Sequence, residues 1–85
     1  MSLTYELKCF LIREKVLPPN HQDIGKSLSN IGKCYDLLNQ LNLALAYYKR
    51  ALIVYEQCLP FEHEDRKDVK LKIEQLSEKI EEMNI

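Results

Sequence analysis

The segment Asp23–Leu38, with the sequence DIGKSLSNIGKCYDLL, decides the fold of this 85-residue chain. Its large apolar residues recur at steps of four, three, four and three, at Ile24, Leu28, Ile31, Tyr35 and Leu38. This spacing places them on one face of an α-helix. Asn20 is a suitable N-cap for that helix, Asp23 favours its first turn, and Asn39 suits a left-handed C-cap. The pattern therefore predicts a helix over residues 21–38.

A second helix is predicted directly afterwards, over residues 41–58, in LNLALAYYKRALIVYEQC. Its apolar side chains form two sides, with Ala44, Tyr48, Ala51 and Tyr55 on one and Leu41, Leu45, Leu52 and Leu59 towards the other. A helix with two apolar sides needs neighbours in two directions. Because Gly32 has no side chain, the second helix can approach the first closely, beside Ala44 or Ala51. Pro60 ends this second helix of the predicted hairpin.

The chain repeats itself at an interval of 42 residues. LPPNH at residues 17–21 returns as LPFEH at 59–63, and six of twenty positions are identical between 5–24 and 47–66. The identical pairs are Tyr5/Tyr47, Glu14/Glu56, Leu17/Leu59, Pro18/Pro60, His21/His63 and Asp23/Asp65. A fixed interval of this size is typical of stacked helical repeats. The two Leu-Pro motifs are thus predicted to join successive helices, with Pro ending one helix and the next residues starting another.

Seven residues of the hairpin resemble the tetratricopeptide repeat pattern: Leu28, Ile31, Gly32, Tyr35, Ala44, Tyr48 and Ala51. The 42-residue interval, the stretches SLSNIGKCY and ALAYYKRAL, and the repeated Leu-Pro connector are similar to the longer repeats of kinesin light chains. The resemblance is good over residues 17–63 and weaker on both sides. It implies an all-α fold, a short tetratricopeptide-type α-solenoid of about four antiparallel helices.

The resemblance divides the chain into three segments. Residues 1–17 correspond to the second helix of a preceding partial repeat whose first helix is absent, residues 18–60 to one full hairpin, and residues 61–85 to a C-terminal capping helix. In the last helix, expected at 64–83, Glu74 replaces Gly32 and Ser77 replaces Tyr35, so a close second helix is not expected there. Its apolar stripe comprises Val69, Ile73, Leu76, Ile80 and Met83. This stripe either caps the array or pairs with a second chain as a coiled coil.

Composition and motifs limit the possible functions. The formal net charge is −1 and the pI about 6.1, without a basic patch, so a nucleic-acid partner is not expected. No apolar run approaches the roughly 20 residues of a membrane helix, and the N-terminus does not resemble a signal peptide, so a cytoplasmic location is expected. Ser27 and Ser29 lack a nucleophile turn, and Gly25 and Gly32 cannot form a phosphate loop. We therefore expect neither enzymatic activity nor a cofactor.

The cysteines and histidines are interpreted as structural. Cys9, Cys34 and Cys58 are widely spaced and odd in number, which predicts free thiols that act as small apolar residues. His21 and His63 occupy equivalent repeat positions, about 10 Å apart in stacked hairpins, which is too far for one metal. They are expected near helix starts, and no metal site is expected.

The candidate binding residues are Lys26, Asn30 and Lys33, at i, i+4 and i+7 opposite the core face of the first full helix. The resemblance implies that such helices line a concave surface that holds extended peptides, with the asparagine reaching the peptide backbone. Asparagine offers both a donor and an acceptor, and the lysines favour an acidic ligand. The alternative is a solvated polar face. The expected function is a non-catalytic protein-interaction module, an adaptor in the manner of kinesin light chains.

Two alternatives remain open: a structural self-assembly segment, or the C-terminal piece of a larger tetratricopeptide protein whose activity lies elsewhere. Self-association is predicted through residues 3–17, which carry two apolar arcs. One arc comprises Leu3, Leu7, Phe10 and Leu11, and the other comprises Tyr5, Cys9, Ile12 and Val16. Since only one neighbouring helix follows in the chain, one arc is expected to stay exposed, and the chain is expected to self-associate or to be poorly stable.

Overall fold

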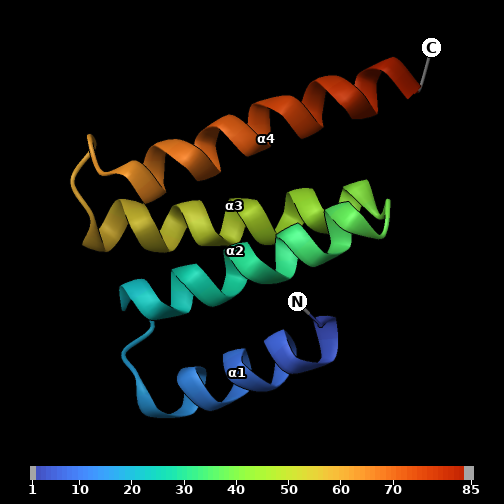
Figure 1. The fold of residues 1–85 in the computed structure, drawn as a ribbon. Coiled ribbons are helices and arrows are strands. Elements are labelled where there is room, and N and C mark those ends of the chain that lie inside the picture. The colour runs from blue at the N-terminus through green and yellow to red at the C-terminus, as the bar shows by residue number, and fades with distance from the viewer. Residues whose placement is uncertain (1, 84–85) are drawn as a thin grey trace.

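The computed structural model describes residues 2–83, which form four α-helices and no strand (Figure 1). The helices are α1 (Leu3–Val16), α2 (Gln22–Leu37), α3 (Leu41–Cys58) and α4 (Glu64–Met83). The all-α prediction is confirmed, and each predicted bound lies within one residue of the observed one. Residues 1, 84 and 85, at the ends of the predicted segments 1–17 and 61–85, lie outside the described residues.

Successive helices run in alternating directions, and each packs mainly on its neighbours in the chain. As a result, α2 and α4 run the same way, on either side of α3 (Figure 1). The molecule measures 43 × 31 × 16 Å along its principal axes. This thin row of antiparallel helices is the arrangement that stacked hairpins produce.

The core is densest where α2 meets α3. Ala44 and Ala51 are completely buried, and Tyr48 lies between them with 2% of its surface exposed. A Cβ atom added to Gly32 would lie 3.2 Å from the Ala44 carbonyl oxygen and 3.2 Å from the Tyr48 ring. The close approach predicted at Gly32 is therefore confirmed.

A second close approach, at Gly25, was not predicted. A Cβ atom added there would lie 2.6 Å from Cε1 of Tyr55, closer than real side chains pack. Gly25 thus makes room for the Tyr55 ring two turns before α2 presents Gly32 to α3. Two small residues, rather than one, set how closely α2 and α3 pack.

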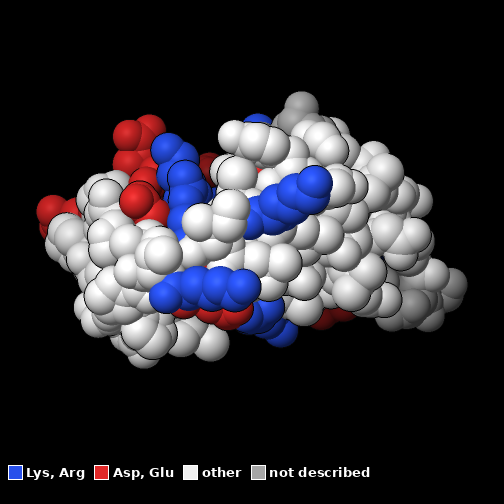
Figure 2. All heavy atoms as spheres, turned by 90° about the horizontal axis from the view of Figure 1, so that it is seen from below, with Lys and Arg blue, Asp and Glu red and all other residues white. Residues whose placement is uncertain are grey.

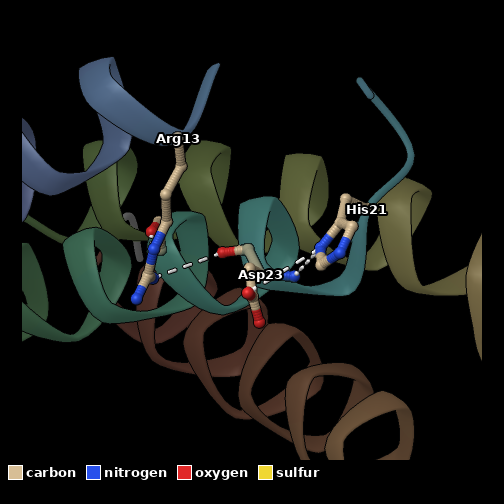
Figure 3. Close-up of polar contacts among 4 residues, drawn as sticks. Arg13, His21 and Asp23 are labelled. Carbon is tan, nitrogen blue, oxygen red and sulfur yellow. Dashed lines mark hydrogen bonds and ion pairs between the residues drawn. The ribbon is translucent and has the colours of Figure 1, made fainter. Parts of the chain in front are cut away.

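The repeated Leu-Pro motifs form the same turn twice. The His21 backbone N–H donates to the Pro18 carbonyl at 3.0 Å, and the His63 N–H donates to the Pro60 carbonyl at 3.0 Å. Each imidazole then caps the following helix, because its Nδ1 accepts the backbone N–H of the aspartate two residues later, at 3.0 Å for His21 and 3.1 Å for His63. Figure 3 shows the first of these caps.

The prediction of Asn20 as the N-cap was wrong, since Asn20 lies inside the turn that begins at Pro18 and the cap is His21. The predicted left-handed conformation of Asn39 is confirmed, with a φ of 60°, but the C-cap itself is Leu38 and Asn39 is the residue after it. Asparagine tolerates this conformation better than most residues. The connection from α2 to α3 can therefore be short.

The apolar stripe of α4 packs as expected except at its end. Val69 and Leu76 are buried, and Ile73 and Ile80 contact the core, but 66% of Met83 is exposed. The difference arises because the C-terminal turns of α4 diverge from α3 (Figure 1).

The cysteines are free thiols, but they differ in environment. Cys34 is buried, Cys9 is partly buried and Cys58 is exposed, so Cys58 departs from the predicted role as a small core residue. Burial raises the pKa of the Cys34 thiol, which keeps it protonated. Among the described helices, none is long and apolar enough to cross a bilayer.

Candidate functional site

The three candidate residues line one pocket of about 390 Å³ that lies between α2 and α4. Lys26 and Lys33 are exposed, and Asn30 is partly buried between them together with Ser29. Their spacing places them on one wall because seven helical residues span two turns. The residues that the sequence predicts as a set are therefore close together in space.

The floor of the pocket is formed by two tyrosines of α3. Tyr48 and Tyr55 line it although only 2% and 3% of their surfaces are exposed. Burial disfavours the phenolate and raises the pKa of Tyr48 to about 12, and it raises the pKa of Tyr55 as well. Both rings are therefore uncharged at neutral pH and offer a flat aromatic base between two charged walls.

The second wall belongs to α4, and its residues were not among the predicted site residues. It consists of Asp65, Asp68, Val69 and Lys72. The signal for this wall was present in the repeat, because the 42-residue interval places Asp68 at the position of Lys26 and Lys72 at that of Asn30. Equivalent positions of parallel neighbouring helices face the same side of a solenoid.

The pocket therefore carries both signs of charge. Its lining includes the ammonium groups of Lys26, Lys33 and Lys72 and the carboxylates of Asp65 and Asp68. Within residues 2–83, the ion pairs shorter than 4.0 Å are His21–Asp23 and Arg66–Glu56, so none joins these five groups to one another. The charged groups on both walls are thus free to pair with a ligand.

A second surface of interest lies on α1. Tyr5, Ile12 and Val16 expose 65%, 63% and 71% of their surfaces, whereas Phe10 is buried and Leu3 and Leu7 contact the core. Of the two predicted arcs, the one with Tyr5, Ile12 and Val16 is therefore mostly exposed, although its Cys9 is partly buried. The other arc is mostly covered, but its Leu11 is 53% exposed. Figure 2 views the molecule from this side and shows a mostly uncharged face with a few basic side chains across it and acidic side chains mainly towards one end.

The contact between α1 and α2 contains polar groups that the sequence analysis did not identify as partners. Nη1 of Arg13 donates to Oγ of Ser27 at 2.7 Å and lies 3.5 Å from the carbonyl oxygen of Asp23 (Figure 3). Glu6, on the same helix, is also buried, at 7% exposure. Ser27 is completely buried, so the bond to Arg13 satisfies a hydroxyl that water cannot reach.

The titratable side chains are not arranged for metal binding. Within the described residues, no group of three or more His, Cys, Asp and Glu side chains could hold a metal ion. His21 and His63 use their Nδ1 atoms as helix caps. These two side chains therefore have a structural role at the helix starts.

Residues 25–65 match the family model described as tetratricopeptide repeat. This segment is a tetratricopeptide-type repeat. It includes the first wall and the floor of the pocket, and it ends at Asp65 on the second wall. No significant match to a curated protein or to a solved structure was found. A tetratricopeptide-type repeat indicates a protein-interaction module, and this repeat forms one wall and the floor of the pocket.

Proposed function

We propose that this chain is a non-catalytic adaptor module that holds an extended peptide in the pocket between α2 and α4, in the manner of kinesin light chains. The observation that carries the proposal is the convergence of Lys26, Asn30 and Lys33 on one wall above a buried tyrosine floor. An asparagine amide can donate to a peptide carbonyl and accept from a peptide N–H. The lysines attract carboxylates of the ligand.

The dimensions of the pocket fit a short extended segment. Lys26 and Lys33 are seven helical residues apart, which corresponds to about 10 Å along the axis of α2. An extended peptide advances about 3.3 Å per residue, so roughly three or four residues span this wall. So small a contact supports only weak binding, and neighbouring repeats would extend it.

The test is a titration of a capped, fluorescently labelled heptapeptide with glutamates at three positions. The variants are Asn30→Ala and the double change Lys26→Glu/Lys33→Glu, and the matched control is Lys8→Glu/Lys15→Glu, which changes the charge equally on exposed positions of α1. We expect a several-fold loss of affinity for both pocket variants and a much smaller change for the control. Equal affinity in all four proteins, with unchanged helicity, would assign Lys26, Asn30 and Lys33 to a solvated polar face.

The proposal includes a capping role for α4, which its outward residues support. Where α2 presents Ile24 and Leu28 to α3, the equivalent residues of α4 are Arg66 and Lys70. Their cationic groups lie over the Phe61 ring, 5.3 Å and 5.8 Å from its centroid, and Nη1 of Arg66 donates to the Leu59 carbonyl at 3.2 Å. This side of α4 is thus covered by its own charged side chains and does not need another helix.

The exposed arc of α1 favours a second candidate function, self-assembly with another copy of the chain. In α3, the residue equivalent to Tyr5 is Tyr47, which is partly buried and stacks on Tyr35 with 5.5 Å between the ring centroids. The residue equivalent to Ile12 is Val54, which is buried. An apolar arc of this kind can therefore pack against another helix. Sedimentation equilibrium tests it: we expect a dimer that Ile12→Lys/Val16→Lys dissociates. A monomer at high concentration would exclude self-assembly.

A further inference from the structure

The charges in the pocket are distributed unevenly along its length. On α4, Asp65 and Asp68 lie in the first two turns, and Lys72 lies one turn beyond Asp68. With a rise of about 1.5 Å per residue, Asp65 and Lys72 are separated by about 10 Å along the helix axis. The second wall thus changes from acidic to basic within the pocket.

The first wall continues this gradient. Because α2 and α4 run in the same direction, the 42-residue interval places Lys26 level with Asp68 and Asn30 level with Lys72 (Figure 1). Lys33 lies two turns beyond Lys26, so it is about 15 Å further along the groove than Asp65. Among the residues that line the pocket, the end near the helix starts therefore holds two carboxylates and one lysine, and the other end holds two lysines. The carboxylate of Asp36 lies outside this lining, although it is near enough to help raise the pKa of Tyr48.

We infer that the pocket selects a dipolar peptide, with a basic side chain beside Asp65 and Asp68 and an acidic side chain beside Lys33 and Lys72. The inference rests on the proposed function and specifies its ligand. Side chains four residues apart in an extended peptide lie on the same face and about 13 Å apart. This spacing falls within the separation of roughly 10–15 Å between the acidic and the basic end, so the matching ligand has three neutral residues between the two charges.

The acidic end disfavours a ligand that is acidic throughout. A carboxylate placed there would face Asp65 and Asp68, and Lys26 offsets only one of these two charges. The positive end of the α4 dipole does not reverse the balance, because Glu64 and Asp65 already occupy its first turn. A guanidinium group is better suited to this end, since its planar donors can bond to carboxylates.

The experiment compares capped seven-residue peptides at low ionic strength, where exposed charges are least screened. One set carries Arg and Glu with three neutral residues between them, in both chain orders, since either direction can place the charges correctly. The others carry Glu at both positions, Arg at both, or Gln at both. We expect the better Arg/Glu order to bind several-fold more tightly than each of the other three, because exposed ion pairs each contribute only modestly to affinity.

Charge changes in the protein should then change which of these peptides binds most tightly. In Asp65→Asn/Asp68→Lys, the acidic end becomes basic, and the peptide with two glutamates should become the tightest ligand. In Lys33→Glu/Lys72→Glu, the peptide with two arginines should become the tightest. Lys33, Asp65 and Asp68 are exposed and Lys72 is partly exposed, and circular dichroism checks that each variant retains its helices.

The outcomes separate this inference from the proposed function. If the peptides bind but the one with two glutamates equals or exceeds the Arg/Glu peptides, the pocket binds peptides without dipolar selection and the inference is wrong. If the variants leave the order of affinities unchanged, the carboxylates or lysines do not face the ligand, and the inference is again wrong. If no peptide binds, the proposed function itself fails.

Discussion

The joint between α1 and α2 and the joint between α3 and α4 occupy equivalent places in the repeat, but some positions that are apolar or aromatic in the second are polar in the first. Elsewhere the first joint is apolar too, at Phe10, Leu3 and Leu7. In the second joint, the buried residues Tyr48, Tyr55, Val69 and Leu76 are apolar or aromatic. The residues 42 positions earlier are Glu6, Arg13, Ser27 and Cys34. In the first joint, Arg13 and Ser27 occupy the positions that Tyr55 and Val69 occupy in the second, and they form a hydrogen bond with each other.

The comparison shows that similar backbone packing can be maintained by different interactions. The apolar joint stabilises the fold because it removes large side chains from water, which contributes about 25 cal/mol per Å² of apolar surface buried. The polar joint gains less, because a hydrogen bond contributes only about 0.5–1.5 kcal/mol net. We therefore expect α1 to separate from α2 more readily than α4 separates from α3. This places the less stable joint beside the exposed arc of Tyr5, Ile12 and Val16.

The largest expected effect is in the apolar joint. Leu76→Ala should lower the free energy of unfolding by about 2–5 kcal/mol, because it removes a buried side chain and leaves a cavity. Cys34→Ala, at the equivalent position of the polar joint, removes a single sulfur atom and should cost about 1 kcal/mol or less. Urea unfolding followed by circular dichroism measures both. Equal losses would mean that the two joints contribute alike.

An alkaline titration should also distinguish the joints, since Tyr48 is replaced by Glu6 in the first one. The pKa of Tyr48 is about 12 in the folded protein, against 10.0 for a free tyrosine. Its contribution to stability is complete below about pH 10 and is lost as the pH rises through 12, because the unfolded chain releases the proton first. The loss amounts to roughly 2–3 kcal/mol.

The matched variant for this titration is Tyr48→Phe, which keeps the ring and removes the ionisable group. Its free energy of unfolding should fall less steeply than that of the unchanged protein between pH 10 and 12. Because burial also raises the pKa of Tyr55, part of the fall should remain. Identical slopes for the two proteins would show that Tyr48 does not govern alkaline stability.

A further comparison is between Gly32 of α2, which faces α3, and the equivalent residue of α4, Glu74, which is exposed. Gly32→Leu should overpack the contact with Ala44 and Tyr48 and cost about 1–3 kcal/mol. Glu74→Leu, on the exposed side of α4, should change stability by less than about 0.5 kcal/mol. Thermal unfolding of both variants provides the comparison. A comparable loss for Glu74→Leu would contradict the view that this side of α4 has no covering helix.

The smallest effect concerns the polar joint itself. A double-mutant cycle with Arg13→Ala and Ser27→Ala should give a coupling energy of about 0.5–1.5 kcal/mol, because the two side chains share one partly buried hydrogen bond. The matched control pairs Arg13→Ala with Ser29→Ala on the other side of α2, for which we expect additivity. A coupling energy near zero between Arg13 and Ser27 would show that this hydrogen bond does not hold α1 on α2.

Local periodicity was sufficient to predict most of the fold. The spacing of Ile24, Leu28 and Ile31 marked α2, Pro18 and Pro60 marked the connections, and Gly32 marked the contact with α3. These features are predictable because each depends on residues close in sequence or on the repeat. The histidine caps were missed because asparagine is the commoner cap, and only the turn from Pro18 to His21 moves the cap by one residue.

Features that depend on distant partners could not be predicted in the same way. The space that Gly25 leaves is explained only by the ring of Tyr55, thirty positions later, and the burial of Glu6 and Ser27 only by the packing of α1. In the candidate site, the wall with Lys26, Asn30 and Lys33 followed from helical spacing. The wall on α4 depends on α3 bringing α4 parallel to α2.

The most direct test of the central claim, that the pocket between α2 and α4 is the binding site, is NMR mapping of a bound peptide. The measurement records amide chemical shifts of the isotopically labelled protein while the Arg/Glu peptide is added. We expect the perturbed amides to cluster at residues 26–33 of α2 and 65–72 of α4, with little change along α1. Perturbations confined to the arc of Tyr5, Ile12 and Val16, with the pocket unaffected, would contradict it.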